Sequence, residues 1–226
     1  MGQIIAQWMP NVVEKSNDFW KAIADTLVMT AWSGVFIFVI GLAVGITLTV
    51  TKRDGIAENA AVYQTLDKIV NLLRSIPFII LLAGLMPLSR LIMGTAIGLK
   101  GAIVPLVIGC APFYSRQVET ALATVEKGKI EAAESMGCSG PGIVFRVYLR
   151  ESIAPIARGT TITIISLFGL VAMAGAVGAG GLGDFAIRYG HDRGQTDVTI
   201  ASIIAMVVIV TGVQLAGSLV AKKNTH

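Results

Sequence analysis

One polar segment, EAAESMGCSGPGIVFRVYLRES at residues 131–152, carries charged and small side chains between two apolar blocks. Residues 117–136 favour a helix, and Gly137 follows where that helix could end, since glycine readily takes the left-handed conformation that closes many helices. The sequence SGPG at 139–142 is typical of a turn. A short helix with small residues on one side fits a groove in another protein, so we expect this segment to dock a partner. From composition alone, a solvated linker is as good an interpretation as a docking helix.

Other residue types that carry chemistry do not form a recognisable reaction centre. Gly128 and Lys129 lack the earlier glycine and the following hydroxyl of a phosphate-binding loop, which argues against an ATP site of that kind on this chain. The histidines and cysteines have neither metal-ligand nor catalytic spacing. We therefore expect no catalytic, cofactor or metal site. These four residues are His191, His226, Cys110 and Cys138.

The composition is that of a membrane protein. Of 226 residues, 54% are hydrophobic and 14% are charged, and the mean hydropathy is +0.74; soluble domains carry about 25% charged residues. Residues 26–51, 159–183 and 198–221 are free of charge, and each run exceeds the roughly 20 residues that a helix needs to span a bilayer. We expect an all-α polytopic membrane protein.

Two shorter uncharged runs, 75–89 and 101–115, each contain two prolines. Neighbouring helices can satisfy the backbone groups that a proline frees, so we count both runs as spans. The chain is then a 26–221 transmembrane domain between a 1–25 extracytoplasmic segment and a 222–226 cytoplasmic tail, with a cytoplasmic loop at 119–152. The five expected spans cover about 26–51, 69–89, 98–118, 156–178 and 198–221.

Basic residues set the expected orientation. Twelve Lys and Arg residues fall in 52–74, 116–158 and the C-terminal tail, and six fall on the opposite side. Because cytoplasmic loops are enriched in Lys and Arg, the N-terminus is predicted outside and the C-terminus inside. The polar segment then lies in the cytoplasm.

The three long runs contain no ionisable side chain. Carriers driven by protons or sodium usually place such groups inside the membrane. We therefore expect another subunit to supply the energy for any uphill transport. A self-sufficient channel or secondary carrier is the alternative from a different class, and it predicts transport by the purified chain alone.

Small residues suggest helix packing and a pathway. Gly34, Gly41 and Gly45 share one face of the first span, which predicts close approach of another helix.

The span at 156–178 combines hydroxyl side chains with Gly and Ala, and is our candidate for the wall of a pathway. Its candidate pathway or gate residues are Met173, Phe168 and Ser166. A flexible thioether could plug a narrow pore, although ordinary packing is the competing interpretation.

The polar segment resembles the EAA loop of bacterial ABC importer permeases. Glu131, Ala132 and Ala133 are followed by Gly137 at the family spacing, while Arg150 stands where the family usually has proline. The resemblance implies a coupling helix whose residues Glu131, Ala132, Ala133 and Gly137 face a separate ATP-hydrolysing subunit, which would hold the ATP-Mg.

Further stretches resemble the methionine-importer type of these permeases: RSIPFIILL at 74–82, residues 94–119, and GAVGAGGLG at 175–183. The resemblance implies the type I importer architecture in a bacterial inner membrane. It also implies a permease homodimer, two ATP-binding cassette subunits and a periplasmic or lipid-anchored methionine-binding protein, which would meet loops 89–100 and 178–197. The cargo would be D- or L-methionine; another small amino acid or a quaternary amine remains the alternative.

Overall fold

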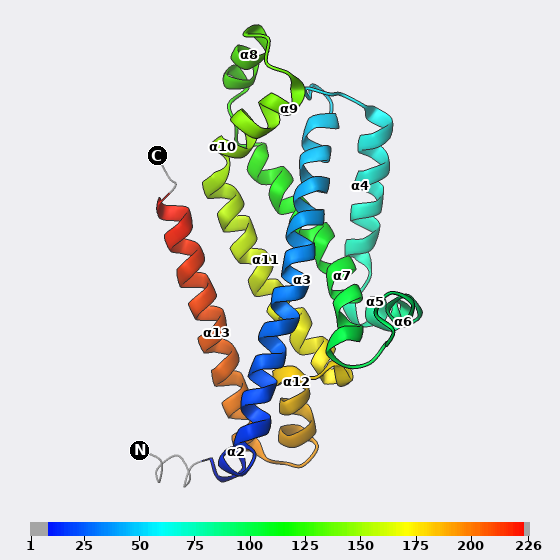
Figure 1. The fold of residues 1–226 in the computed structure, drawn as a ribbon, viewed down its shortest axis with the longest axis vertical. Helices are drawn as coiled ribbons and strands as arrows, with labels where there is room; N and C mark the ends of the chain where they lie inside the picture. The colour runs from blue at the N-terminus through cyan, green and yellow to red at the C-terminus, as the bar shows by residue number, and fades with distance from the viewer. Residues whose placement is uncertain (1–8, 224–226) are drawn as a thin grey trace. The chain divides into compact units, whose positions relative to one another are not determined.

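In the computed structural model, which describes residues 9–223, the described chain is built from helices joined by short turns, with no strand (Figure 1). Three short π-helical turns, η1 to η3, interrupt or follow the α-helices. The elements are α2 (Pro10–Glu14), α3 (Ser16–Thr51), α4 (Ala60–Ser75), α5 (Phe78–Gly84), α6 (Met86–Met93), α7 (Gly98–Leu122), α8 (Lys127–Ser135), α9 (Gly140–Ile143), η1 (Val144–Tyr148), α10 (Leu149–Glu151), α11 (Ile153–Ala174), η2 (Gly175–Ala179), α12 (Gly181–Phe185), η3 (Ala186–His191) and α13 (Thr196–Lys223).

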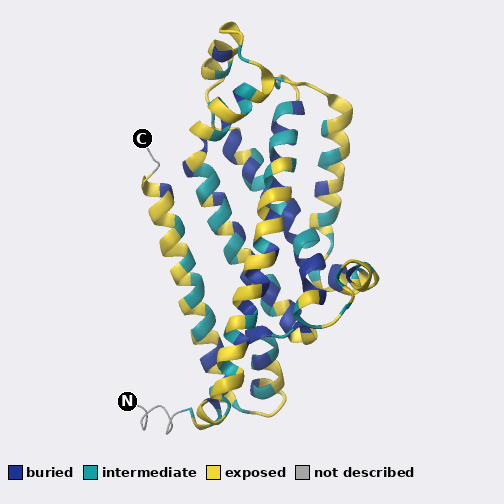
Figure 2. Cartoon of the chain, viewed as in Figure 1, coloured by how far each residue is buried: buried dark blue, intermediate teal, exposed yellow. Residues whose placement is uncertain are grey.

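Four of these helical stretches are long and apolar enough to cross a membrane. They confirm the prediction of an all-α polytopic membrane protein. Figure 2 shows α13 exposed along most of its length, which suits a helix whose apolar side chains face lipid or another subunit. The four are Ser16–Thr51, Gly98–Leu122, Ile153–Ala179 and Thr196–Lys223.

The span expected at 69–89 is not one helix. The structure ends α4 at Ser75, holds Ile76 in an extended conformation with φ −83° and ψ 125°, and starts α5 at Phe78. Pro77 explains the break, because a proline ring clashes with a helical conformation of the preceding residue. A second break after Gly84 separates α5 from α6. The described chain therefore has four continuous spanning helices rather than five.

Two other boundaries differ from expectation. The first span begins at Ser16, so much of the segment expected to precede the membrane belongs to α3; residues 1–8 and 224–226 lie outside the described part. The helix expected over 117–136 is interrupted between α7 and α8. There the Thr124 hydroxyl donates to the Ala121 carbonyl at 2.7 Å, a local bond that competes with helical hydrogen bonding.

The contacts divide the chain into two units. Unit 1 comprises Met1–Val35, Pro77–Val107 and Ile164–Val213, and unit 2 comprises Phe36–Ile76, Ile108–Thr163 and Gln214–His226. In unit 1 a buried apolar cluster includes Ala22, Phe185 and Val198.

Two sets of hydrogen bonds join the helices of unit 1 near the apolar cluster. Asn11 donates from its backbone and side-chain nitrogens to the Asp197 carboxylate, both at 2.9 Å. The Thr26 hydroxyl accepts the backbone N–H of Leu182 at 2.8 Å. The start of α13 and the start of α12 are thereby fixed against α2 and α3.

Close helix packing organises unit 2. A Cβ added at Gly41 would lie 2.6 Å from Tyr114 Cδ1, and one added at Gly45 would lie 2.6 Å from Val118 Cβ. These contacts confirm the predicted approach of a helix, α7, at two of the three glycines. The third, Gly34, has its nearest such neighbour at 3.9 Å and is not a close contact.

Polar contacts join α4, α7 and α11 within unit 2. The Arg116 guanidinium on α7 donates to Asn71 at 3.0 Å and pairs closely with Asp67, both on α4. The Tyr114 and Thr160 hydroxyls share a hydrogen bond of 2.9 Å between α7 and α11. Partly buried charge pairs of this kind hold a helix in register because breaking one leaves its partner poorly solvated.

We predict that Gly45→Ala destabilises the chain. The added methyl would overlap Val118 and lie 2.7 Å from the Ser115 carbonyl oxygen, and overpacking of this kind costs about 1–3 kcal/mol. Thermal unfolding of the purified chain in detergent measures the effect. Gly212→Ala is the matched control, since its added Cβ meets nothing within 4 Å; equal unfolding temperatures for the two variants would contradict close α3–α7 packing.

Candidate functional site

The residues Glu131, Ala132 and Ala133 lie on α8, a nine-residue helix in unit 2 (Figure 1). Gly137 follows its end with φ +75°, and its N–H donates to the Glu134 carbonyl at 2.9 Å. Such a left-handed residue satisfies the last carbonyls of a helix. The structure confirms the predicted role of Gly137 as the end of the helix.

The two alanines of α8 point in different directions. Ala133 is 2% exposed and faces the interior of unit 2, whereas Glu131, Ala132 and Gly137 are exposed. The expectation that Ala133 also faces a partner is therefore wrong for its side chain. Adjacent helical residues lie about 100° apart around the axis, so Ala132 and Ala133 cannot share one contact face.

An ion pair ties α8 to the residues that precede α11. Lys129 Nζ lies 2.5 Å from Glu151 Oε2, and this hydrogen bond raises the pKa of Lys129 above its usual range. The Ser152 hydroxyl donates to the Ala121 carbonyl at 3.2 Å. Sequence reasoning missed the Lys129–Glu151 tether because 22 residues separate the two side chains and no local pattern marks them.

A hollow of about 350 Å³ lies beside α8 within unit 2, and Lys52, Leu122, Glu131 and Tyr148 contribute to its wall. Tyr148 is buried, and its burial, together with the charge of Glu134, raises the pKa of its hydroxyl. The tyrosine therefore stays neutral at physiological pH. The hollow leaves part of the α8 surface without packed neighbours on this side.

The candidate gate residues separate onto two faces of α11. Met173 is 44% exposed and Ser166, two helical turns earlier, is also exposed, whereas Phe168 is 2% exposed. Gly169 continues the exposed face between them. The structure thus brings Met173 and Ser166 together on one surface of unit 1, while Phe168 belongs to the interior and cannot line an open pathway.

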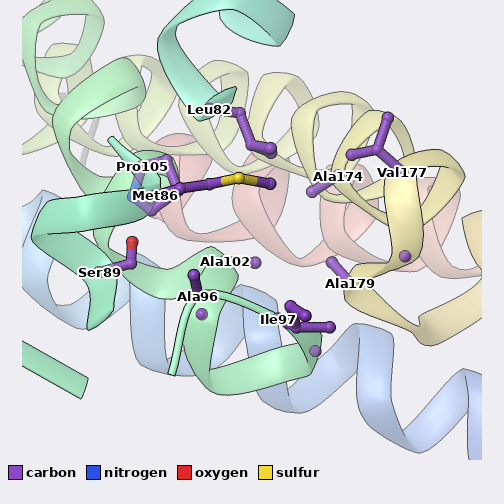
Figure 3. A pocket seen from close by; sticks show the side chains of 13 residues that line it. Leu82, Met86, Ser89, Ala96, Ile97, Ala102, Pro105, Ala174, Val177 and Ala179 are labelled. Carbon is purple, nitrogen blue, oxygen red and sulfur yellow. The ribbon is translucent and has the colours of Figure 1, made fainter. Parts of the chain in front are cut away.

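A small cavity of about 40 Å³ lies near the end of this face, also within unit 1. Figure 3 shows Met86 extending across it, with Ser89, Ala174 and Val177 around it. The volume holds a few water molecules but no amino acid, so the cavity is not a cargo site in this conformation. Its residues Met86 and Ser89 come from α6, which carried no sequence signal for a site.

Within residues 9–223, no group of three or more His, Cys, Asp or Glu side chains could hold a metal ion. The described chemistry is that of surfaces: a charged helix tied to the start of α11, and a small-residue face with an exposed thioether.

The family described as "Binding-protein-dependent transport system inner membrane component" matches residues 41–225. The chain is 39% identical to the "Probable D-methionine transport system permease protein MetI" of Vibrio cholerae, over 98% of this chain and 97% of that protein. It is 41% identical to the "Methionine import system permease protein MetP" of Bacillus subtilis, over 95% of this chain and 96% of that protein.

Two solved structures are also similar to this chain. A chain from "Inward facing conformations of the MetNI methionine ABC transporter" matches with a TM-score of 0.90 and 44% identity, covering 96% of this chain and 99% of that one. A chain from "Crystal structure of an amino acid ABC transporter with histidines" matches with a TM-score of 0.78 at 16% identity, which shows a shared fold alone.

We predict that reversing either charge of the α8 tether loosens α8. Lys129→Glu or Glu151→Lys places like charges together and should speed amide hydrogen exchange over residues 127–135 by several-fold. The double reversal should restore slow exchange. Because the pair is about half exposed, the overall unfolding temperature should change little.

Lys127→Glu is the control for the tether, since the structure shows no ion pair for Lys127 within the described chain. Exchange in α8 that is the same in all four variants would show that the pair does not hold this helix.

Proposed function

This chain belongs to the family of binding-protein-dependent transport system inner membrane components, and we propose how its two surfaces serve that role. Its function is that of the permease subunit of a methionine ABC importer, and it is not itself an enzyme. The observation that carries this conclusion is the match of nearly the whole chain to methionine permeases at about 40% identity.

The chain works as part of a complex with ATPase subunits of the MetNI type. We propose that two copies of this permease associate with two such subunits and a methionine-binding protein, and that ATP-Mg is bound by the ATPase subunits alone. The type I importer architecture and the transport of D- or L-methionine belong to the same proposal. The MetI and MetP relatives support methionine as cargo.

The docking surface is the exposed side of α8. We assign Glu131, Ala132 and Gly137 to the contact with the ATPase subunit, and Ala133 to the packing that supports them. Lys129 and Glu151 then carry motion of α8 to the start of α11. This assignment rests on the exposure of the first three residues and on the 2.5 Å ion pair.

We propose that α4 and α5 together form a fifth, broken crossing. Five crossings place the two ends on opposite sides, with the N-terminus outside and α8 in the cytoplasm. The excess of Lys and Arg on the α8 side supports this orientation. The break at Pro77 is tolerated where neighbouring helices or water satisfy the freed backbone groups.

The loops 89–100 and 178–197 are proposed to meet the binding protein. There the Tyr189 ring is approached by three cations, with Arg193 at 4.7 Å and Lys15 and Arg188 each at 5.8 Å from its centroid. Lys15 also pairs with Glu14 at 3.5 Å, and Arg188 pairs with Asp184. Of these three cations, Arg193 alone has no ion pair within the described chain, and it can attract a carboxylate of a docking partner.

Transport would proceed by alternating access. Closure of the ATPase subunits on ATP moves α8, and the tether passes that motion to α11. The face with Ser166, Gly169 and Met173 then becomes accessible first from one side of the membrane and then from the other. A thioether at Met173 can close a narrow opening or contact the cargo side chain because its three rotatable bonds let it adapt.

Reconstitution in vesicles tests the proposed function. Permease plus ATPase subunit plus loaded binding protein should accumulate labelled methionine on ATP addition, whereas permease alone should transport none. Uptake by the permease alone would favour the self-sufficient carrier. Accumulation of another amino acid or a quaternary amine in place of methionine would change the assigned cargo.

In this assay we predict that Gly137→Val abolishes ATP-driven uptake while membrane insertion is kept. Valine is strained at φ +75° and would alter the end of α8. Gly94→Val is the matched control, because Gly94 has φ +74° and equally open surroundings but ends α6. Co-purification of the ATPase should fall for the first variant only; normal uptake by Gly137→Val would contradict the docking assignment.

Met173→Ala tests the proposed gate. Removal of the thioether should change methionine uptake several-fold, since the α11 face loses its flexible side chain. Ile203→Ala, an exposed position on α13, serves as control. Unchanged uptake for Met173→Ala would assign Met173 to ordinary packing.

A further inference from the structure

Two large apolar side chains are exposed in the segment around α8. Between residues 98 and 152, the large hydrophobic residues classed as exposed are Met136, at 76%, and Phe145, at 69%. Most other exposed large hydrophobics of the described chain lie on α3, on α13 or on the helices from α4 to α6. A spanning helix leaves such side chains in lipid, but these two belong to no spanning helix.

Both side chains sit on ordered backbone. The Met136 N–H donates to the Ala132 carbonyl at 3.1 Å, so Met136 lies one helical turn beyond Ala132, on the exposed side of α8. Phe145 lies in η1, between the buried residues Ile143 and Tyr148. Because α8 packs against α9 and η1 within unit 2, the two side chains are carried by elements that contact one another.

Charged residues lie close to both positions in the sequence. Glu134, Arg146 and Arg150 are exposed, and charged side chains are costly inside the hydrocarbon core of a bilayer. Isolated apolar side chains in a charged setting resemble the anchors of a protein interface, where Met and Phe are enriched and charged residues form the rim.

We propose that Met136, which lies between Ala133 and Gly137, and Phe145 are apolar anchors for the ATP-hydrolysing subunit. The inference rests on the proposed docking role of α8, with which Met136 is continuous through Ala132. The partner must then present apolar pockets that receive a thioether and a phenyl ring. The docking surface thereby extends from α8 to η1, so the partner contacts the chain on both sides of α9.

Binding of the purified ATPase subunit to the permease in nanodiscs tests this surface. Met136→Ala and Phe145→Ala should each weaken binding by about tenfold or more, because a few buried anchors dominate interface affinity. The double variant should weaken it further. Leu219→Ala is the matched control, since Leu219 is 68% exposed but lies on α13, and it should bind as the wild type does. Unfolding temperatures should be unchanged, since neither anchor is buried in this chain.

The outcomes separate this inference from the proposed function. If Gly137→Val loses binding while Met136→Ala and Phe145→Ala bind normally, docking stands and the anchors are overturned. If the wild-type permease binds no ATPase subunit, the proposed function itself is contradicted. If Phe145→Ala instead weakens only attachment of residues 140–148 to lipid, measured by quenching from lipid-borne probes, the anchor proposal is also overturned.

Discussion

The ion pair between Lys129 and Glu151 is the contact on which the functional account depends. It joins a short helix that packs loosely beside a hollow to the residues that begin α11. The helix has a fixed end, because Gly137 closes it in the left-handed conformation. In the proposed mechanism this helix moves as a rigid body, and the ion pair determines which element follows it. A permease without an ATP site of its own needs such a connection.

The sequence predicted the membrane class, all four of the continuous spanning helices and the end of α8, because these depend on composition and on local backbone preference. It failed at 69–89, where the uncharged run hid the break that Pro77 imposes on Ile76. It also failed for Ala133 and Phe168, since burial depends on which helix face packs inward. The Lys129–Glu151 tether depends on tertiary folding across 22 residues and leaves no mark in local sequence.

Exposed apolar surface has different meanings in different parts of this chain. On α3 and α13 it suits the bilayer, and on the Met173 face of α11 it is interrupted by Ser166 and Gly169, which suits a polar passage. Around α8 it is confined to two side chains among charges. The same physical quantity therefore separates lipid contact, pathway and partner contact once the surrounding residues are considered.

The adjacent alanines of α8 allow a direct test of the central claim that this helix receives the ATPase subunit. Ala132→Cys and Ala133→Cys differ by one position, and only the first side chain is exposed. With a short bifunctional reagent in native membranes, the account predicts cross-linking of the ATPase subunit from Ala132→Cys and none from Ala133→Cys. Labelling of Ala132→Cys by a membrane-impermeant reagent added outside the cell, with no ATPase product, would contradict it.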